Sequence, residues 1–186
     1  MNCSRLRPVN GCVLVSLILA LCACGRGAAS NESGASPSSA TVASGEQIKA
    51  LEASGQLPKL DRSTDIRGPD NDNNGIRDDI DAWIAAQLIS DVQKKATQQM
   101  ARVQQAKLLA DLDDKEALQA LGERSAAGIV CLGDVFMPER QKGRDLRSQL
   151  EAIMANTKER AKQYIAYNRA VSGSSGRLPK GNTCEP

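Results

Sequence analysis

The sequence predicts an all-α protein, a small antiparallel three-helix bundle, and three observations lead to that prediction. Apolar residues recur at steps of three and four over three long stretches, which is the period of an amphipathic helix. No stretch alternates apolar and polar residues for long enough to predict a strand. Short runs rich in glycine, proline and aspartate separate the three stretches, and helices with short connections pack as antiparallel neighbours.

The first bundle helix is expected at about residues 79–110, because one apolar stripe runs through that range. Polar side chains such as Lys94, Gln98 and Arg102 lie opposite the stripe. The positions of the stripe are Ile80, Trp83, Ile84, Leu88, Val92, Ala96, Met100 and Val103.

The second helix is expected at about residues 115–132, with Asp113 or Asp114 as its N-cap. The third is expected at about residues 144–171, where Gly173 would end it. The apolar stripe of the third helix consists of Leu146, Leu150, Ile153, Met154, Ala161, Tyr164 and Ile165.

Tyr167 falls off this third stripe, so its ring could lie on the surface, where a tyrosine could anchor a partner protein. The favoured interpretation is that the ring packs against a neighbouring loop instead.

Residues 1–23 have the form of a secretory signal peptide rather than part of the fold. Arg5 and Arg7 form a positively charged n-region. The apolar run that follows, residues 12–24, is too short to span a membrane.

The end of that run, Leu21-Cys22-Ala23-Cys24, resembles the lipobox of bacterial lipoproteins. The resemblance implies cleavage before Cys24, lipidation of Cys24 and attachment to the cell envelope. Gly25 stands where an aspartate would signal retention at the inner membrane of enteric bacteria, so the outer membrane is favoured. The alternative is a soluble secreted protein cut near Ala28.

Residues 24–44 comprise the lipidated cysteine and a Ser/Gly/Ala-rich linker, whose composition predicts a flexible, disordered tether. Residues 45–69 are expected to hold a short helix, about 46–54, and an extended segment. Ser44 and Gln47 have the spacing of a capping box, and Pro58 prevents the helix from continuing.

Signal cleavage and lipidation of Cys24 leave Cys131 and Cys184 as the remaining cysteines of an exported chain. Thiols pair in an oxidising compartment, so one disulfide between them is expected. Closing a loop of roughly 50 residues should stabilise the fold by about 4 kcal/mol.

The charge of the processed chain balances, because Arg5 and Arg7 account for the whole formal charge of +2. A neutral domain without a basic run is a poor candidate for nucleic-acid binding, since phosphate neutralisation supplies most of that affinity. Membrane attachment would then depend on the lipid.

The acidic stretch DNDNNGIRDDID, residues 70–81, has the ligand spacing of a calcium loop. Gly75 stands at position 6, where such a loop turns sharply. Hard oxygen ligands without histidine or cysteine favour Ca²⁺, with Mg²⁺ as a possible competitor. The expected ligands at positions 1, 3, 5, 7, 9 and 12 are Asp70, Asp72, Asn74, the carbonyl of Ile76, Asp78 and Asp81.

The loop resembles those of EF-hands and, more closely, the DxDxDGxxDxxD loops of thrombospondin type 3 repeats. It departs from an EF-hand in three ways: Asp81 replaces a glutamate, Arg77 replaces an apolar residue at position 8, and no helix precedes Gly68-Pro69. A single loop of this kind suggests a weak site, with a dissociation constant of roughly 10⁻⁴ to 10⁻³ M.

The alternative interpretation of the same stretch is an acidic helix N-terminus without a metal. Asp78 would cap the helix, and Asp79 and Asp81 would suit the positive end of its dipole. That interpretation gives no role to Asp70 and Asp72.

The chain contains no histidine, which excludes nucleophile–histidine pairs and histidine metal sites. We therefore expect a non-enzymatic calcium-binding envelope lipoprotein that acts as a protein-binding or structural module for an envelope or secreted partner. The alternatives are a periplasmic inhibitor or immunity lipoprotein that neutralises a toxic enzyme, and a hydrolase working with two facing carboxylates roughly 5 to 9 Å apart. Oligomeric state is left open.

Overall fold

A computed structural model describes residues 37–186 of the protein, so the predicted signal peptide, Cys24 and linker residues 25–36 lie outside the described residues. All regular elements within 37–186 are helices, and the all-α class is confirmed. The elements are α1 (Pro37–Ala53), α2 (Asp78–Ala85), α3 (Asp91–Leu108), α4 (Lys115–Val135), α5 (Arg140–Met154) and α6 (Lys158–Ala170).

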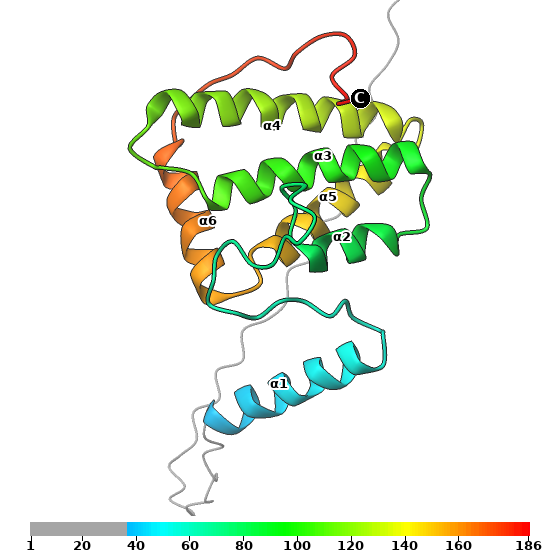
Figure 1. The fold of residues 1–186 in the computed structure, drawn as a ribbon, viewed down its shortest axis with the longest axis vertical. Coiled ribbons are helices and arrows are strands. Elements are labelled where there is room, and N and C mark those ends of the chain that lie inside the picture. Colours follow the sequence, from blue (N-terminus) through cyan, green and yellow to red (C-terminus); the bar gives the residue numbers. More distant parts are fainter. Residues whose placement is uncertain (1–36) are drawn as a thin grey trace, which may run out of the picture.

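Helix α3 is the centre of the fold and contacts α2, α4, α5 and α6. Helices α3 and α4 lie side by side along most of their length, with α5 behind them and α6 across one end (Figure 1). Helix α1 stands apart at the end of a long connection that runs from residue 54 to residue 77 (Figure 1).

The single helix predicted at 79–110 is wrong, because the chain breaks at residues 86–90 and forms α2 and α3. Ser90 caps α3 with a complete capping box. The Ser90 hydroxyl accepts a hydrogen bond from the backbone N–H of Gln93, and the side-chain oxygen of Gln93 accepts one from the backbone N–H of Ser90. The turn allows α2 to fold back against α3 and α5. Leu88, expected in the core, is instead 97% exposed within this turn.

The helix predicted at 144–171 is also divided, into α5 and α6. The hydroxyl of Thr157 accepts a hydrogen bond from the backbone N–H of Arg160 and so begins the new helix. Ile165 does not join the core and is half exposed. The apolar stripe predicted at 144–171 continues through this break, because α5 and α6 keep a similar apolar spacing on its two sides.

The second predicted helix is confirmed as α4, with Asp114 as its N-cap, and it extends three residues further than expected. Helix α1 begins at Pro37 instead of near Glu46, so part of the predicted linker, residues 37–44, is helical. Proline suits the first position of a helix, because its missing N–H would have no partner there.

The core is largely aliphatic, with Trp83 and Phe136 as its large aromatic members. The disulfide between Cys131 and Cys184 is confirmed and ties the C-terminal segment to α4. No helix among residues 37–186 has the length and apolar character needed to cross a bilayer. The main core cluster includes Ile76, Ile80, Trp83, Ile84, Ala96, Met100, Ala101, Leu108, Cys131, Leu132, Phe136, Leu146, Leu150 and Met154.

Candidate metal centre

The loop at residues 70–81 turns back on itself directly before α2. The backbone N–H of Asp78 donates to the carbonyl of Pro69 over 2.9 Å and closes the base of the loop. The carboxylate of Asp70 accepts hydrogen bonds from the backbone N–H groups of Asn74 (3.1 Å) and Gly75 (3.0 Å). Gly75 has a φ of +81°, a conformation that glycine adopts without steric cost.

Asn74 lies between the two acidic ends of the loop. Its side-chain amide nitrogen donates to Asp72 over 2.9 Å and to Asp81 over 2.6 Å. The carboxylates of Asp72 and Asp81 therefore face the same amide nitrogen. The other carboxylate oxygen of Asp81 accepts from Gln98 on α3 over 3.4 Å.

Asp78 faces the loop rather than capping α2. The N-cap of α2 is Arg77, and its side chain makes no capping hydrogen bond. The Asp78 carboxylate accepts from the backbone N–H of Asn71 over 3.0 Å. The acidic first turn of α2 still suits the helix dipole, but the proposed capping role of Asp78 is wrong.

Three predicted ligands converge on one another. Asp70, Asp72 and Asp78 each offer a carboxylate oxygen, and these oxygen atoms all lie within 4.8 Å of one another. Asp72 is exposed, and the other two are partly buried. The cluster could hold a metal ion.

The remaining predicted ligands take different places. Asn74 lies inside the loop, and Asp81 reaches it through Asn74. Ile76 buries its side chain completely in the core, while its N–H donates to the side-chain oxygen of Asn74 over 2.8 Å. Ile76 therefore anchors the loop, whether or not its carbonyl is a ligand.

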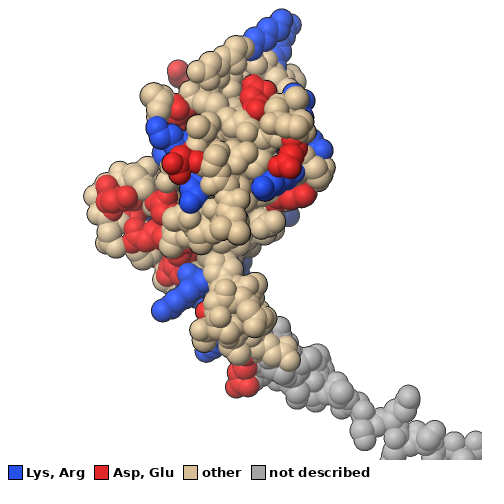
Figure 2. Space-filling view, turned by 90° about the vertical axis from the view of Figure 1, so that its right-hand side faces the viewer, with Lys and Arg blue, Asp and Glu red and all other residues tan. Residues whose placement is uncertain are grey.

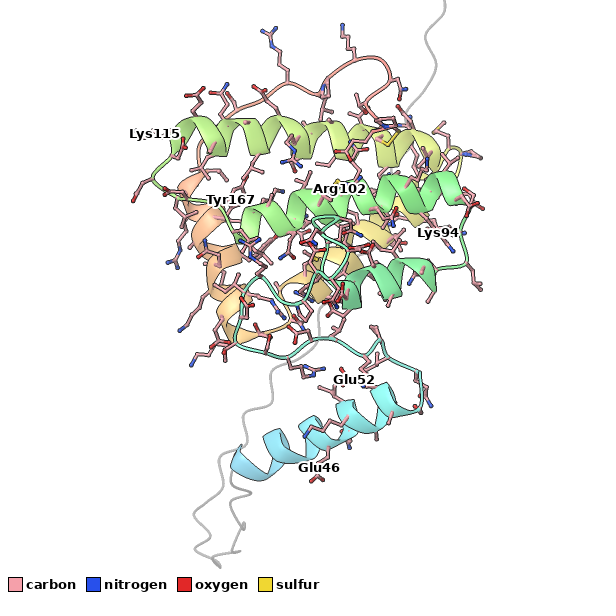
Figure 3. The ribbon with its side chains drawn as sticks, viewed as in Figure 1. Glu46, Glu52, Lys94, Arg102, Lys115 and Tyr167 are labelled. Carbon is pink, nitrogen blue, oxygen red and sulfur yellow. A yellow bond between two sulfur atoms is a disulfide. The ribbon has the colours of Figure 1, made fainter. Side chains whose placement is uncertain are left out.

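No Lys or Arg among residues 37–186 forms an ion pair with the carboxylates of Asp70, Asp72, Asp78 or Asp81. Arg102 on α3 is the cation whose stem lies beside Gly75 (Figure 3), but its guanidinium binds Glu185 in the C-terminal segment. Figure 2 shows acidic side chains gathered on a projecting lobe at its left. This side of Figure 2 corresponds to the front of Figure 1, where the loop before α2 lies.

Arg77 is a residue whose role the sequence did not reveal. Its side chain is fully buried and binds the Asp79 carboxylate through Nε (2.7 Å) and Nη2 (2.9 Å). It also donates to the carbonyls of Ile153 and Met154 at the end of α5. These last carbonyls have no partner within their own helix, so a cation is favourable there.

A second buried arginine, Arg160 on α6, lies beside Arg77. It donates to the Asp61 carboxylate and to three backbone carbonyls, those of Asp61, Asp65 and Ile66. We call Arg77, Arg160, Asp61, Asp79 and Asn156 the arginine cluster. The side-chain oxygen of Asn156 accepts from both arginines, over 3.5 and 3.0 Å.

The pKa of Asp61 reflects this environment. Burial alone would raise the pKa, but hydrogen bonds from Arg160 and Ser63, with the charge of Arg160, lower it from 3.8 to about 2. Asp79 completes the link to the acidic loop at residues 70–81, because its carboxylate also accepts from the backbone N–H of Asp61 over 2.8 Å. The acidic loop is thus attached to the core through Arg77 and Asp79.

Tyr167 is buried, so its ring packs within the fold and is not an exposed anchor for a partner. The ring packs in a small cluster with Leu118 and Leu121 of α4, and the ammonium group of Lys107 lies 5.7 Å from its centroid. Lys107 also donates to Ser125 over 2.9 Å. Figure 3 shows Tyr167 between α6 and the end of α3, and only 3% of the residue is exposed.

The hydrolase alternative requires two facing carboxylates in a cleft. One hollow on the described surface, between α4 and α5, contains Asp134, and another beside the α2–α3 turn contains Asp145. Each hollow has a single carboxylate in its lining, so neither supplies the required pair.

Comparison of the chain with protein-family models, characterised proteins and solved structures finds no match.

Proposed function

We propose that this chain is a non-enzymatic calcium-binding protein of the bacterial cell envelope. In this proposal a lipid on Cys24 anchors the chain, the outer membrane being favoured, and the helical body acts as a protein-binding or structural module. The observation that supports the metal site is the convergence of the oxygen atoms of Asp70, Asp72 and Asp78 within 4.8 Å.

Repulsion among these carboxylates supports the choice of a cation. Like charges a few ångströms apart repel unless positive charge lies between them, and none of these groups has an ion pair within residues 37–186. The oxygen donors match the preference of Ca²⁺, and Mg²⁺ is the competing ion. Asp81 would complete the set of carboxylate ligands. Asn74 would join them only if its amide rotated, because its side-chain oxygen accepts from the backbone N–H of Ile76 and its nitrogen faces Asp72 and Asp81.

The ion would have a structural role. Through Arg77 and Asp79 the loop is joined to the end of α5 and to Asn156 in the connection between α5 and α6. A bound ion would therefore fix the start of α2 against the helical body. A single loop without a paired partner gives no obvious element that opens or closes.

Thermal unfolding with and without calcium tests this proposal, using Asp72→Ala and the matched surface variant Asp113→Ala. Calcium at 100 times its dissociation constant should stabilise the wild type and Asp113→Ala by about 2.7 kcal/mol. Asp72→Ala should show little or no gain. An equal response of all three proteins, or no response in any of them, would contradict the metal site.

The anchor has a separate test. Cys24→Ala should move the protein from the membrane fraction to the soluble fraction and remove its incorporation of labelled palmitate. Palmitate labelling that persists in this variant would contradict lipidation at Cys24.

A further inference from the structure

A hollow of about 310 Å³ lies between α4, α5 and the C-terminal segment. Its apolar surface comes from Ile129, Val130 and Leu132 on α4 and from Leu178 in the tail. Ile129 is 40% exposed and Leu178 is 64% exposed. A concave apolar surface of this size can take one or two aliphatic side chains.

Three arginines border the hollow on the α5 side: Arg140, Arg144 and Arg147. Their spacing of four and three residues places them on one face of the helix, in a row about 10 Å long at 1.5 Å per residue. None of the three forms an ion pair within the described part of the chain. Arg144 instead donates to the side-chain oxygen of Gln141 over 3.0 Å.

The lining of the hollow is therefore unbalanced in charge. It contains three guanidinium groups and one carboxylate, that of Asp134. Elsewhere in the described fold, the buried guanidiniums of Arg77 and Arg160 both pair with carboxylates. Within the described residues, no carboxylate pairs with the arginines of the α5 row.

We propose that this hollow binds an acidic peptide segment of a partner protein. Aliphatic side chains of the peptide would enter between Ile129 and Leu178, and its carboxylates would pair with the arginine row. The length of the row favours a peptide over a small anion, because one phosphate or carboxylate spans roughly 3 Å and cannot reach all three groups. The concave floor is a poor fit to a flat lipid surface.

This inference rests on the protein-binding role proposed above, but the metal loop contributes nothing to the hollow. The tail that carries Leu178 is tied to α4 by the disulfide at Cys184, so this edge of the hollow is held by a covalent link.

Fluorescence polarisation with the full-length chain tests the inference. The probe is a labelled 14-residue peptide of glutamate and leucine at helical spacing. One control peptide has lysine in place of glutamate, and the other has serine in place of leucine. The acidic leucine peptide should bind at least tenfold more tightly than either control.

Matched triple variants then locate the site. Arg140→Gln/Arg144→Gln/Arg147→Gln should weaken binding at least tenfold. Lys158→Gln/Lys162→Gln/Arg169→Gln removes the same charge from exposed positions of α6 and should change it less than twofold. Circular dichroism of both variants should match the wild type, because none of the six side chains belongs to the core.

Three results would overturn the inference: equal loss of binding in the two triple variants, equal binding of the serine peptide, or preferential binding to vesicles of anionic phospholipid. The measurements are repeated in EDTA. Peptide binding that persists there supports the hollow even if the calcium proposal fails. A calcium response without peptide binding leaves the metal loop and removes this inference alone.

Discussion

The acidic loop and the arginine cluster are both concentrations of charge, but the protein balances their charges in opposite ways. In the arginine cluster each guanidinium meets a carboxylate and several carbonyls, from positions as far as 99 residues away. In the acidic loop three carboxylates converge, and the hydrogen bonds to Asp70, Asp72, Asp78 and Asp81 come from N–H groups of the loop itself and of Gln98.

Buried charges and exposed charges have different requirements in this protein. Arg77 and Arg160 are buried, so the fold must supply their partners, and removal of one partner leaves an uncompensated charge. The acids of the loop are partly hydrated and can remain without a cation at modest cost. A cation from solution can therefore balance the charge of the loop, whereas the arginines of the arginine cluster already have their partners within the protein.

The largest expected effect is loss of a buried arginine. Arg160→Ala should lower the free energy of unfolding by roughly 3 to 5 kcal/mol, because it leaves Asp61 and three backbone carbonyls without their donor. Arg169→Ala, on the exposed face of the same helix, should change it by less than about 0.5 kcal/mol. Urea unfolding measures both, and equal effects would mean that the arginine cluster is not a stabilising unit.

Gly68 tests the space around the same cluster. It has a φ of +66°, and a Cβ there would lie 2.4 Å from Cδ of Arg77 and 2.9 Å from Nη2 of Arg160. Gly68→Ala should therefore destabilise the protein by about 2 to 3 kcal/mol. Gly122→Ala, in α4 with open space around it, should stabilise it by up to about 1 kcal/mol. The opposite signs can be read from thermal unfolding of the two variants.

The pH dependence of stability should reveal Asp61. Its folded-state pKa, about 2, lies below the ordinary value of 3.8, so its contribution is complete above that value and is lost as the pH falls from about 4 to 2. Solvent reaches part of this carboxylate, which limits the contribution to about 1 kcal/mol. The stability difference between wild type and Asp61→Asn should shrink across this range, and a constant difference would contradict the ion pair.

The smallest effect is expected in the acidic loop without metal. Asp72→Asn in EDTA removes one of three mutually repelling charges and should raise stability by no more than about 0.5 kcal/mol. Asp79→Asn, which breaks the bidentate pair with Arg77, should lower stability under the same conditions. Destabilisation by both variants would show that the loop, like the arginine cluster, depends on its carboxylates without any ion.

The helical class could be predicted from periodicity, and the disulfide from the number of cysteines left after processing. The divisions of two helices were missed, although part of the signal was present. Ser90 and Gln93 have capping-box spacing, and an apolar residue at Leu88 concealed the break because it fits the helical stripe. Thr157 gave a weaker signal, since a lone threonine also occurs inside helices.

The acidic loop can be recognised in the sequence, but the arginine cluster cannot. Ligands of a loop are neighbours in the sequence, so their spacing is visible as a pattern. The partners of Arg77 lie at residues 153–156, and nothing local indicates them. The one visible sign was Arg77 at position 8 of the loop, where an EF-hand has an apolar residue. The structure explains this departure, because the Arg77 side chain is buried against the end of α5.

Direct titration of the protein with calcium tests whether the acidic loop binds an ion. Isothermal titration calorimetry of the wild type should show one site with a dissociation constant of roughly 10⁻⁴ to 10⁻³ M, and Asp78→Asn should weaken it by tenfold or more. The Asp113→Asn control should bind as the wild type does. Absence of saturable binding up to about 10 mM calcium, or identical binding by all three proteins, would contradict the account.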